Sequence, residues 1–297
     1  MSEKQPDRPL TVCVTFEFDA LALWSGMLGT QDPAQLSRGE FAAVAAPRIL
    51  DYLREQEIPT TWGAPGQSLL AFPDVAKRVR DEGHEFVHHG WAHEKMSLYD
   101  AAGQREILEK GLEAFDQVLG LRPQGYRAPA FEFAPDTPQL LEEYGFTFDS
   151  SFAGDDYNAY YMRSGDVASR TEPYVFGSPM DLVELPASWT IMDIPCFEFM
   201  WGVLPGLRAP STVEEIWRED FDYALERNPG GVFIITLHPQ SIGRGHRWLM
   251  IERLIEHFRS TGRVQFETLG AYADRWRAEH DYATYCATPS VHNPTPN

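Results

Sequence analysis

The sequence contains little cysteine, and the few cysteines form no recognisable pair. Three occur in 297 residues, far apart and without CxxC spacing: Cys13, Cys196 and Cys286. An odd number of isolated cysteines excludes a disulfide framework and a zinc ribbon. The same pattern is typical of proteins in a reducing compartment.

Long apolar runs and an excess of basic residues are missing as well. No apolar stretch reaches the roughly 18 residues of a membrane-spanning helix, and the N-terminus MSEKQPDRPLTV contains no secretion signal. Acidic residues outnumber basic residues by 44 to 25, which gives a net charge of −19. A surface this negative repels phosphate backbones and anionic lipids. We therefore expect a cytoplasmic protein that binds neither nucleic acid nor a membrane.

The chain also lacks internal repeats and Gly/Ser-rich linkers, so we expect a single domain over residues 10–280. Residues 1–9 are expected to be a disordered N-terminus, and residues 281–297 a C-terminal tail. Residues 153–210 are irregular and rich in Pro, Gly and aromatics, with one strand-like stretch, LVELPASW, at 182–189. Long loops of this kind in a compact domain are more often functional than accidental.

Strand-like and helix-like segments alternate along the rest of the chain. Repeated β–α units imply parallel strands wrapped by helices, in an open doubly wound sheet or a barrel. In both architectures, reactive residues gather at the C-terminal ends of the strands. The predicted strands are 10–18, 58–64, 84–88, 123–128, 146–152, 231–239 and 264–269, and the predicted helices are 41–57, 72–83, 97–119, 135–145, 211–227, 246–262 and 271–280.

Side chains capable of metal binding or acid–base chemistry follow four of these strands. An acidic pair ends the first strand, histidines follow the third, an arginine ends the fourth, and a histidine ends the strongly apolar strand at 231–239. The set consists of Glu17, Asp19, His88, His89, His93, Arg127 and His238. Placement at strand ends favours a functional site over a chance collection of polar residues.

The spacing of His89 and His93 predicts a metal site. Two histidines four residues apart project on one side of a helical turn and can share a cation. The Asp19 carboxylate as third ligand leaves an open position for a water, as in catalytic sites. We expect a divalent cation, with zinc as the first choice and cobalt or nickel as alternatives. A metalloprotease HExxH motif is excluded because Gly90 follows His89.

The remaining residues suit the hydrolysis of an amide. Glu17 lies two residues before Asp19 and is expected to act as general base, while His238 supplies the proton that an amine leaving group needs. Arg127 is expected to pair with Glu17 and keep it ionised. A surface ion pair for Arg127 and a capping or core role for His238 are the structural alternatives. Asp149 and Asp193 are both candidates to orient His238.

With these motifs in this order, the chain resembles the polysaccharide deacetylase family, also known as the NodB-homology domain or carbohydrate esterase family 4. That family carries an acidic pair, a histidine pair, an Arg-x-Pro segment and a late Leu-His, which correspond here to TFEFD, HHGWAH, RAPAF and TLHP. The resemblance covers residues 10–270. The HHG-aromatic-x-HE form and HPQSIGR are most similar to the branch with a peptidoglycan deacetylase, cofactor-free allantoinases and cyclic imide hydrolases.

This resemblance implies a distorted (β/α) barrel of parallel strands, a metal-activated water and a homo-oligomer, in this branch a tetramer. The chain departs from the family at Glu17, where Asp is usual, and the longer side chain shifts the carboxylate by around 1 Å. Substrate contacts are expected from Pro129, Phe131, Trp189, Trp201 and Arg244.

Three functions are compatible with the sequence. The first is metal-dependent N-deacylation of a small-molecule or sugar amide, a hydrolysis of a non-peptide carbon–nitrogen bond. The second is ring-opening of a small cyclic amide or imide, as in allantoinases and cyclic imidases, with or without a metal. The third is a non-catalytic carbohydrate-binding relative that keeps the fold. The lack of a secretion signal favours a small substrate over a wall polymer.

Overall fold

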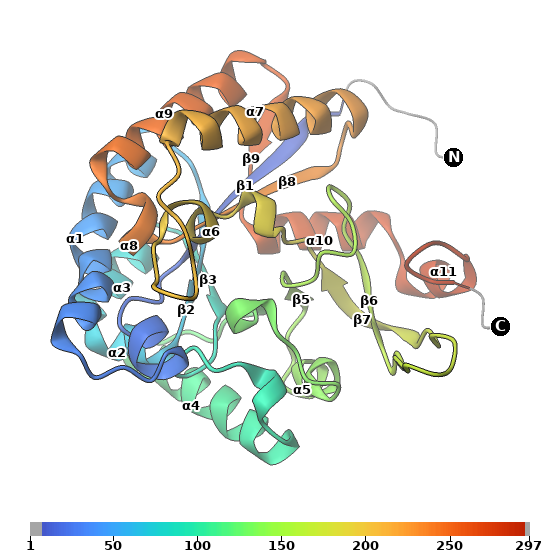
Figure 1. Cartoon of the computed structure of the whole chain (residues 1–297). Coiled ribbons are helices and arrows are strands. Elements are labelled where there is room, and N and C mark those ends of the chain that lie inside the picture. The colour runs from blue at the N-terminus through green and yellow to red at the C-terminus, as the bar shows by residue number, and fades with distance from the viewer. Residues whose placement is uncertain (1–7, 295–297) are drawn as a thin grey trace.

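The computed structural model describes residues 8–294, which form one sheet curled part of the way into a barrel, with helices around its outside (Figure 1). All strand pairs in the described chain are parallel except β6–β7. The distorted barrel of parallel strands that the sequence predicted is therefore confirmed. Within residues 8–294 the strands are β1 (Leu10–Glu17), β2 (Thr60–Ala64), β3 (Glu85–His88), β4 (Gly125–Tyr126), β5 (Phe148–Asp149), β6 (Tyr160–Ser164), β7 (Ser178–Glu184), β8 (Val232–Leu237) and β9 (Val264–Phe266).

The strand order places the first strand next to the last ones. It runs β6-β7-β5-β4-β3-β2-β1-β8, and β9 also pairs with β1. All eight residues of β1 are buried, as expected for a parallel strand covered on both faces. Because neighbouring strands are parallel, the C-terminal ends of β1, β2, β3, β4 and β8 meet at one edge of the sheet.

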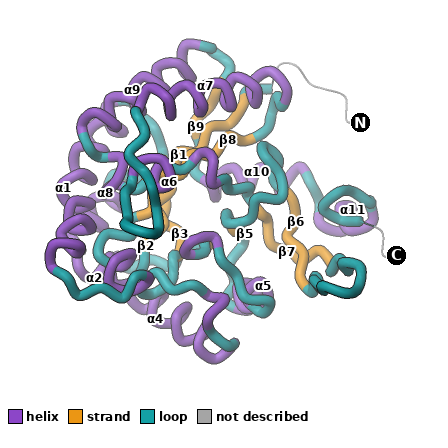
Figure 2. Tube along the Cα trace, viewed as in Figure 1, coloured by secondary structure: helices purple, strands orange, loops and turns teal. Residues whose placement is uncertain are grey.

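Longer helices pack on the outer face of the curled sheet, and short turns lie near its C-terminal edge (Figure 2). Among residues 8–294, no helix is both long enough and apolar enough to cross a membrane. The helices are α1 (Pro33–Glu55), α2 (Gly66–Ala71), α3 (Pro73–Asp81), α4 (Ala101–Leu119), α5 (Thr137–Glu143), α6 (Asp193–Phe197), α7 (Pro210–Arg227), α8 (Pro239–Ile242), α9 (Gly245–Ser260), α10 (Leu269–Glu279) and α11 (Tyr282–Ala287). The π-helical turn η1 (Leu23–Met27) and the 3₁₀ turns η2 (Met96–Leu98), η3 (Pro129–Phe131) and η4 (Trp189–Ile191) complete the set.

Local capping explains where two long helices begin. Asp32 accepts a hydrogen bond from the backbone N–H of Ala34 (2.9 Å), and Pro33 occupies the first helical position, so α1 starts eight residues before the predicted 41. Asp100 caps α4 by accepting the Gly103 backbone N–H, so α4 starts at Ala101, four residues after the predicted 97. The expected helix boundaries shift because side-chain caps, rather than the apolar pattern, define the first turns.

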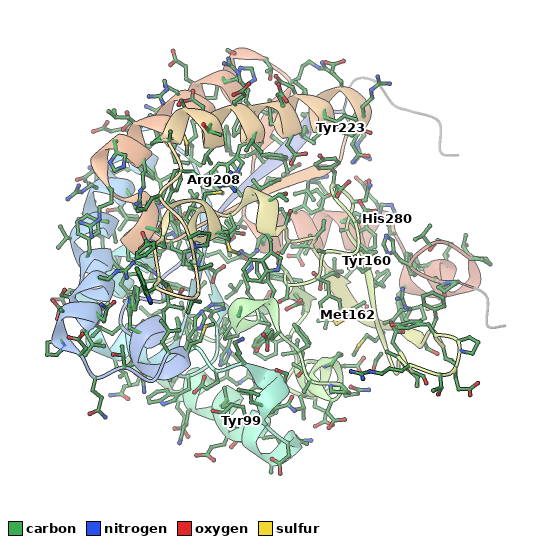
Figure 3. The ribbon with its side chains drawn as sticks, viewed as in Figure 1. Tyr99, Tyr160, Met162, Arg208, Tyr223 and His280 are labelled. Carbon is green, nitrogen blue, oxygen red and sulfur yellow. The ribbon has the colours of Figure 1, made fainter. Side chains whose placement is uncertain are left out.

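The segment predicted as an irregular middle region and the predicted C-terminal tail both contain regular structure. β6, β7, η4 and α6 lie within residues 153–210. Residues 281–294 of the predicted tail include α11, and the His292 ring stacks on Tyr160, labelled in Figure 3, with centroids 4.0 Å apart. Residues 1–7 of the predicted disordered N-terminus, and residues 295–297, lie outside the described chain.

A buried pair of acidic residues links β5 to β7. Asp149 and Glu184 are register neighbours, and both are fully buried. Glu184 accepts hydrogen bonds from the backbone N–H groups of Ser151 (3.0 Å) and Phe152 (2.8 Å). Burial raises the pKa of Asp149 to about 6, and burial together with the Asp149 charge raises the pKa of Glu184 well above its usual value. The pair therefore retains a proton near neutral pH.

This carboxyl pair makes the stability depend on pH. Since both pKa values are raised in the folded state, its favourable contribution is complete below the unfolded values near 4 and is lost as pH rises through about 6 and above. We expect Glu184→Gln to keep the two backbone hydrogen bonds while its amide donates to Asp149. The unfolding free energy of each protein is measured in denaturant at pH 5 and at pH 8. We expect the decrease between these pH values to be smaller for Glu184→Gln than for the natural protein, with a difference of about 1 kcal/mol or more.

The matched control is Glu215→Gln on the exposed side of α7, which leaves the pH slope unchanged. Equal slopes for Glu184→Gln and the natural protein would show that Asp149 and Glu184 do not share a proton.

Candidate metal centre and active site

The strand ends bring together the side chains that the sequence singled out. Glu17 is the last residue of β1, and Asp19 follows two residues later. His89 directly follows β3, Arg127 directly follows β4, and His238 directly follows β8. All five are at most 5% exposed. The sequence predicted that these residues lie together at the C-terminal edge of the sheet, and the structure places them there.

The three predicted metal ligands lie around one point. Asp19, His89 and His93 each offer an atom within 4.8 Å of the others. The Nε2 atoms of His89 and His93 lie 3.4 and 3.6 Å from the two Asp19 oxygens. His89 Nδ1 donates to the backbone carbonyl of Arg127 (2.7 Å), so its Nε2 carries the lone pair that a cation needs.

The charge balance around Asp19 also fits a cation. Asp19 is fully buried, and neither of its carboxylate oxygens accepts a hydrogen bond from the described chain. The neighbouring buried carboxylates have partners of their own, because Glu17 pairs with Arg127 and Asp193 pairs with His238. A buried carboxylate without a hydrogen bond is costly unless it is paired or binds a metal. One carboxylate and two imidazoles form a donor set suited to a divalent cation.

The turn between His89 and His93 is not helical, so the predicted helical turn is wrong. Gly90 and His93 both have positive φ, at 75° and 61°. Glu94 closes the turn by accepting hydrogen bonds from the backbone N–H groups of Trp91 (3.0 Å) and Ala92 (2.8 Å). A glycine at the second position and this carboxylate bring the two imidazoles together without a helix.

Backbone strain is concentrated around this site. Six non-glycine residues of the described chain have positive φ, and four of them are in or beside the site: Ala20, His93, Ala130 and Phe131. Ala20 directly follows the ligand Asp19, and Ala130 and Phe131 lie in η3 after Arg127. Residues held in such conformations cost free energy and tend to occur at active sites.

Glu17 lies between the Arg127 guanidinium, the His89 imidazole and Gly63. One of its oxygens pairs with the Arg127 guanidinium (2.8 Å), and the other lies 3.3 Å from His89 Nε2. Gly63 of β2 is its register partner, and a Cβ at Gly63 would lie 2.3 Å from Glu17 Oε2. The space for the longer Glu17 side chain therefore depends on the absence of a side chain at Gly63.

Arg127 is fully buried and therefore no surface salt-bridge residue. Its guanidinium donates to Glu17, to the hydroxyls of Thr15 and Thr236, and to Ser150 (2.5–3.2 Å). These partners lie on or directly after β1, β8 and β5. The predicted Arg127–Glu17 pair is confirmed.

Asp193, and not Asp149, is the partner of His238. Its carboxylate lies 2.6 Å from His238 Nδ1 and also accepts the His238 backbone N–H (3.0 Å). A bridge between Met192 and Thr236 holds Asp193 beside the end of β8. His238 Nε2 lies 3.6 Å from Asp19 and lines the same cavity, so His238 is no simple core or capping residue.

Burial and the local charges shift the pKa values of the site residues in different directions. Burial lowers the pKa of His93 to about 4. Burial opposes protonation of His238 too, but the Asp193 carboxylate outweighs it and raises the pKa of His238 to about 9. Burial would raise the pKa of Asp19, yet His93, His89 and His238 hold it well below its usual range. The site thus keeps an ionised Asp19 and a neutral His93 beside a protonated His238.

His88 has a structural role despite its place in the HHGWAH motif. Its Nδ1 accepts the Gly90 backbone N–H (3.2 Å), so its Nε2 donates to the Leu108 carbonyl (3.1 Å). Burial lowers its pKa to about 3, and a Cβ at Gly111 would collide with its ring. His88 therefore stays neutral and joins β3 to α4.

A cavity of about 150 Å³ opens onto the site, lined by Glu17, Asp19, His89, His93 and His238. Two predicted substrate contacts, Phe131 and Trp189, line it and pack edge to face with centroids 5.1 Å apart. The other three are absent from its lining: Pro129 is buried in η3, Trp201 is 89% exposed, and Arg244 stacks on Phe41. Arg244 is directed to α1 because it precedes α9 on the outside of the sheet.

Sequence reasoning missed most of the cavity wall and two positioning residues. Their signals were weak, because an apolar residue in an irregular segment looks the same whether it packs in a core or lines a cavity. The apolar run that follows Asp19 and the Gly opposite Glu17 were the available signals. The missed residues are Gly63, Glu94, Leu23, Met27, Leu28, Met192, Ile194, Met200 and Leu204.

The polysaccharide deacetylase family model matches residues 38–148 of the chain. A peptidoglycan deacetylase of Helicobacter pylori is 33% identical over 281 residues, which cover 90% of this chain and 96% of that protein. A peptidoglycan deacetylase-like protein of Gibberella zeae is 31% identical over 285 residues, which cover 88% and 84%.

Solved structures show the same architecture over nearly the full chain. A protein of Mycobacterium smegmatis assigned as a polysaccharide deacetylase superposes with a TM-score of 0.81 at 30% identity, covering 94% of this chain and 93% of that one. Puue allantoinase shares the fold, with a TM-score of 0.76 at 22% identity and 94% of each chain covered. With the site geometry and these relatives together, the chain belongs to the polysaccharide deacetylase family, whose members are hydrolases acting on carbon–nitrogen amide bonds.

Proposed function

We propose that the protein is a divalent-metal-dependent hydrolase that removes an acyl group from a non-peptide amide. The observation that carries this proposal is the Asp19 carboxylate, fully buried, without a hydrogen bond, and flanked by the Nε2 atoms of His89 and His93. A divalent cation held by these three residues would polarise the substrate carbonyl and lower the pKa of a water, with zinc as the first candidate.

The residues around the ligands supply the proton transfers. Glu17 accepts the proton of the attacking water, since its free oxygen lines the cavity while Arg127 holds the other. His238 lines the cavity with its Nε2 atom 3.6 Å from Asp19, and the Asp193 carboxylate accepts its Nδ1 proton and so keeps the ring protonated. His238 donates its Nε2 proton to the departing nitrogen, which an amide requires because an amine anion is a poor leaving group.

Ring-opening of a small cyclic amide or imide is the second candidate. The cavity of about 150 Å³ favours it, because that volume suits a small molecule better than a polymer chain. The same base and acid act in both reactions. The free Cys13, Cys196 and Cys286 support a reducing compartment for either, so we propose a cytoplasmic enzyme.

Metal binding is tested with Asp19→Asn, which keeps the shape of the side chain and removes its charge. We expect the natural protein to gain stability from zinc, by about 2.7 kcal/mol at a hundredfold excess over the dissociation constant, and the variant to gain little. Activity falls by more than about 100-fold. Metal content and melting temperature are measured with and without added zinc, cobalt or nickel.

The matched control is Asp274→Asn on the exposed face of α10, which leaves metal content and activity unchanged. Full activity of the natural protein after complete removal of metal would contradict the metal-dependent reaction and favour a metal-independent ring-opening.

The space for Glu17 is tested with Gly63→Ala. A methyl group here meets the Glu17 carboxylate and displaces it, so we expect kcat to fall roughly 10–100-fold while zinc affinity stays within a few-fold. Adding Glu17→Asp withdraws the carboxylate by one methylene and restores part of the activity. Kinetic constants of both single variants and the double variant are compared as a cycle. An additive loss would rule out this steric coupling.

The proton-donor role of His238 is tested through Asp193→Asn. An amide in place of the carboxylate removes the charge that holds the proton on His238, and we expect kcat to fall by about 10²–10⁴ with KM and metal content nearly unchanged. Asp149→Asn is the comparison, because Asp149 makes no hydrogen bond to His238 in the structure. Equal effects of the two substitutions would contradict the assignment.

A further inference from the structure

The wall of the active-site cavity is apolar apart from the reacting residues. The polar side chains among its lining residues are Glu17, Asp19, His89, His93 and His238, all already assigned to the chemistry, and Trp189 adds one indole N–H. No lysine, arginine, serine, threonine, asparagine or glutamine of the described chain lines it. The wall that faces them includes Leu23, Met27, Leu28, Ile194, Met200 and Leu204.

This wall is an apolar cluster separate from the main core. Leu23, Trp24, Ile194 and Met200 form its buried part, and Met27, Leu28 and Leu204 pack against them while remaining only half-buried. It joins η1 to the segment after α6. Half-buried apolar side chains around a cavity favour contact with an apolar ligand group.

The cluster is fixed in place before any ligand binds. Met200 and Leu204 exchange two backbone hydrogen bonds of 2.8 Å each. Glu198 pairs with Arg38 (2.6 Å) and with Arg247 (2.8 Å), which ties this segment to α1 and α9. The segment with its labelled Arg208 is seen in front of α6 in Figure 3. The apolar wall is thus a built feature of the cavity, and its shape is available to select a substrate.

Sugars fit this cavity poorly. Each hydroxyl that enters gives up hydrogen bonds to water and finds no side-chain partner outside the reacting set except the single indole N–H of Trp189. An ionised group likewise finds no lysine or arginine among the lining residues, since Arg127 is buried against Glu17. An uncharged apolar group meets neither obstacle.

From this wall we infer that the substrate is a small uncharged amide, acyclic or cyclic, whose non-reacting part is a compact apolar group rather than a sugar. The inference rests on the proposed amide hydrolysis and names the substrate class for that site. A cavity of about 150 Å³ is comparable in volume to an apolar protein cavity that binds benzene. A phenyl or short branched aliphatic group therefore fills it.

The first test compares two acetamides with the metal-loaded natural protein. N-benzylacetamide and N-acetylglucosamine both release acetate and a primary amine, so one amine assay measures both. We expect kcat/KM for N-benzylacetamide to exceed that for N-acetylglucosamine by at least roughly 100-fold. Equal or faster hydrolysis of the sugar amide overturns the inference and leaves the proposed hydrolysis standing.

The second test measures binding without turnover. 4-Phenyl-2-butanone replaces the N–H of N-benzylacetamide by a methylene and cannot be hydrolysed, and its binding is measured by titration calorimetry. Leu204→Asn places an amide in the wall with the same branched arrangement of heavy atoms, and we expect affinity to fall at least about tenfold. Leu207→Asn is the matched control, because Leu207 is 68% exposed, lies in the same segment and has a φ of 60° that Asn tolerates.

The two tests separate the inference from the reaction on which it rests. In one outcome the ketone binds, Leu204→Asn weakens its binding, Leu207→Asn does not, and no amide is hydrolysed. The apolar site then stands and the proposed function fails. If the ketone does not bind, or if Leu204→Asn and Leu207→Asn behave alike, the inference is overturned whatever the activity.

Discussion

The site depends on one buried cation, the Arg127 guanidinium. It is fully buried and donates to groups on or directly after β1, β5 and β8, and its own backbone carbonyl accepts the His89 Nδ1 proton. A guanidinium removed from water is costly unless its hydrogen-bonding capacity is used. The guanidinium holds the Glu17 carboxylate, and the backbone carbonyl of the same residue sets the His89 tautomer. The proposed base and a proposed metal ligand are therefore both positioned by Arg127.

The buried carboxylates around this centre are stabilised in different ways. Glu17 and Asp193 each have a hydrogen-bonded cationic partner, Asp149 and Glu184 share a proton, and neither oxygen of Asp19 accepts a hydrogen bond from the described chain. A low-dielectric interior forces such choices, because an unpaired buried charge is expensive. The carboxylate left without a partner is the one that two imidazoles approach. The fold thereby reserves one strong anionic ligand for a cation while keeping its neighbours neutralised.

The cavity next to these charges shows how one family scaffold can serve different substrates. The reacting set lies on strand ends, whereas the wall comes from η1 and the segment after α6. Strand ends are fixed by the hydrogen bonds of the sheet, while connecting segments change with little effect on the core. At residue 17 the proposed base is a glutamate, and Gly63 leaves room for its side chain.

The sequence alone determined the alternation of strands and helices, because apolar periodicity is a local property of the chain. It also determined which polar side chains lie at strand ends, and hence the candidate chemistry. These are Glu17, Asp19, His89, Arg127 and His238. The sequence misjudged the turn from His89 to His93, whose positive φ values depend on Glu94 and Gly90 rather than on spacing. Only the tertiary structure decided that Asp193 orients His238, that Gly63 accommodates Glu17, and that Leu23 and Leu204 face the same cavity. Each of these depends on a contact between residues dozens of positions apart, and a side chain's chemistry does not by itself reveal which distant neighbour the fold will place against it.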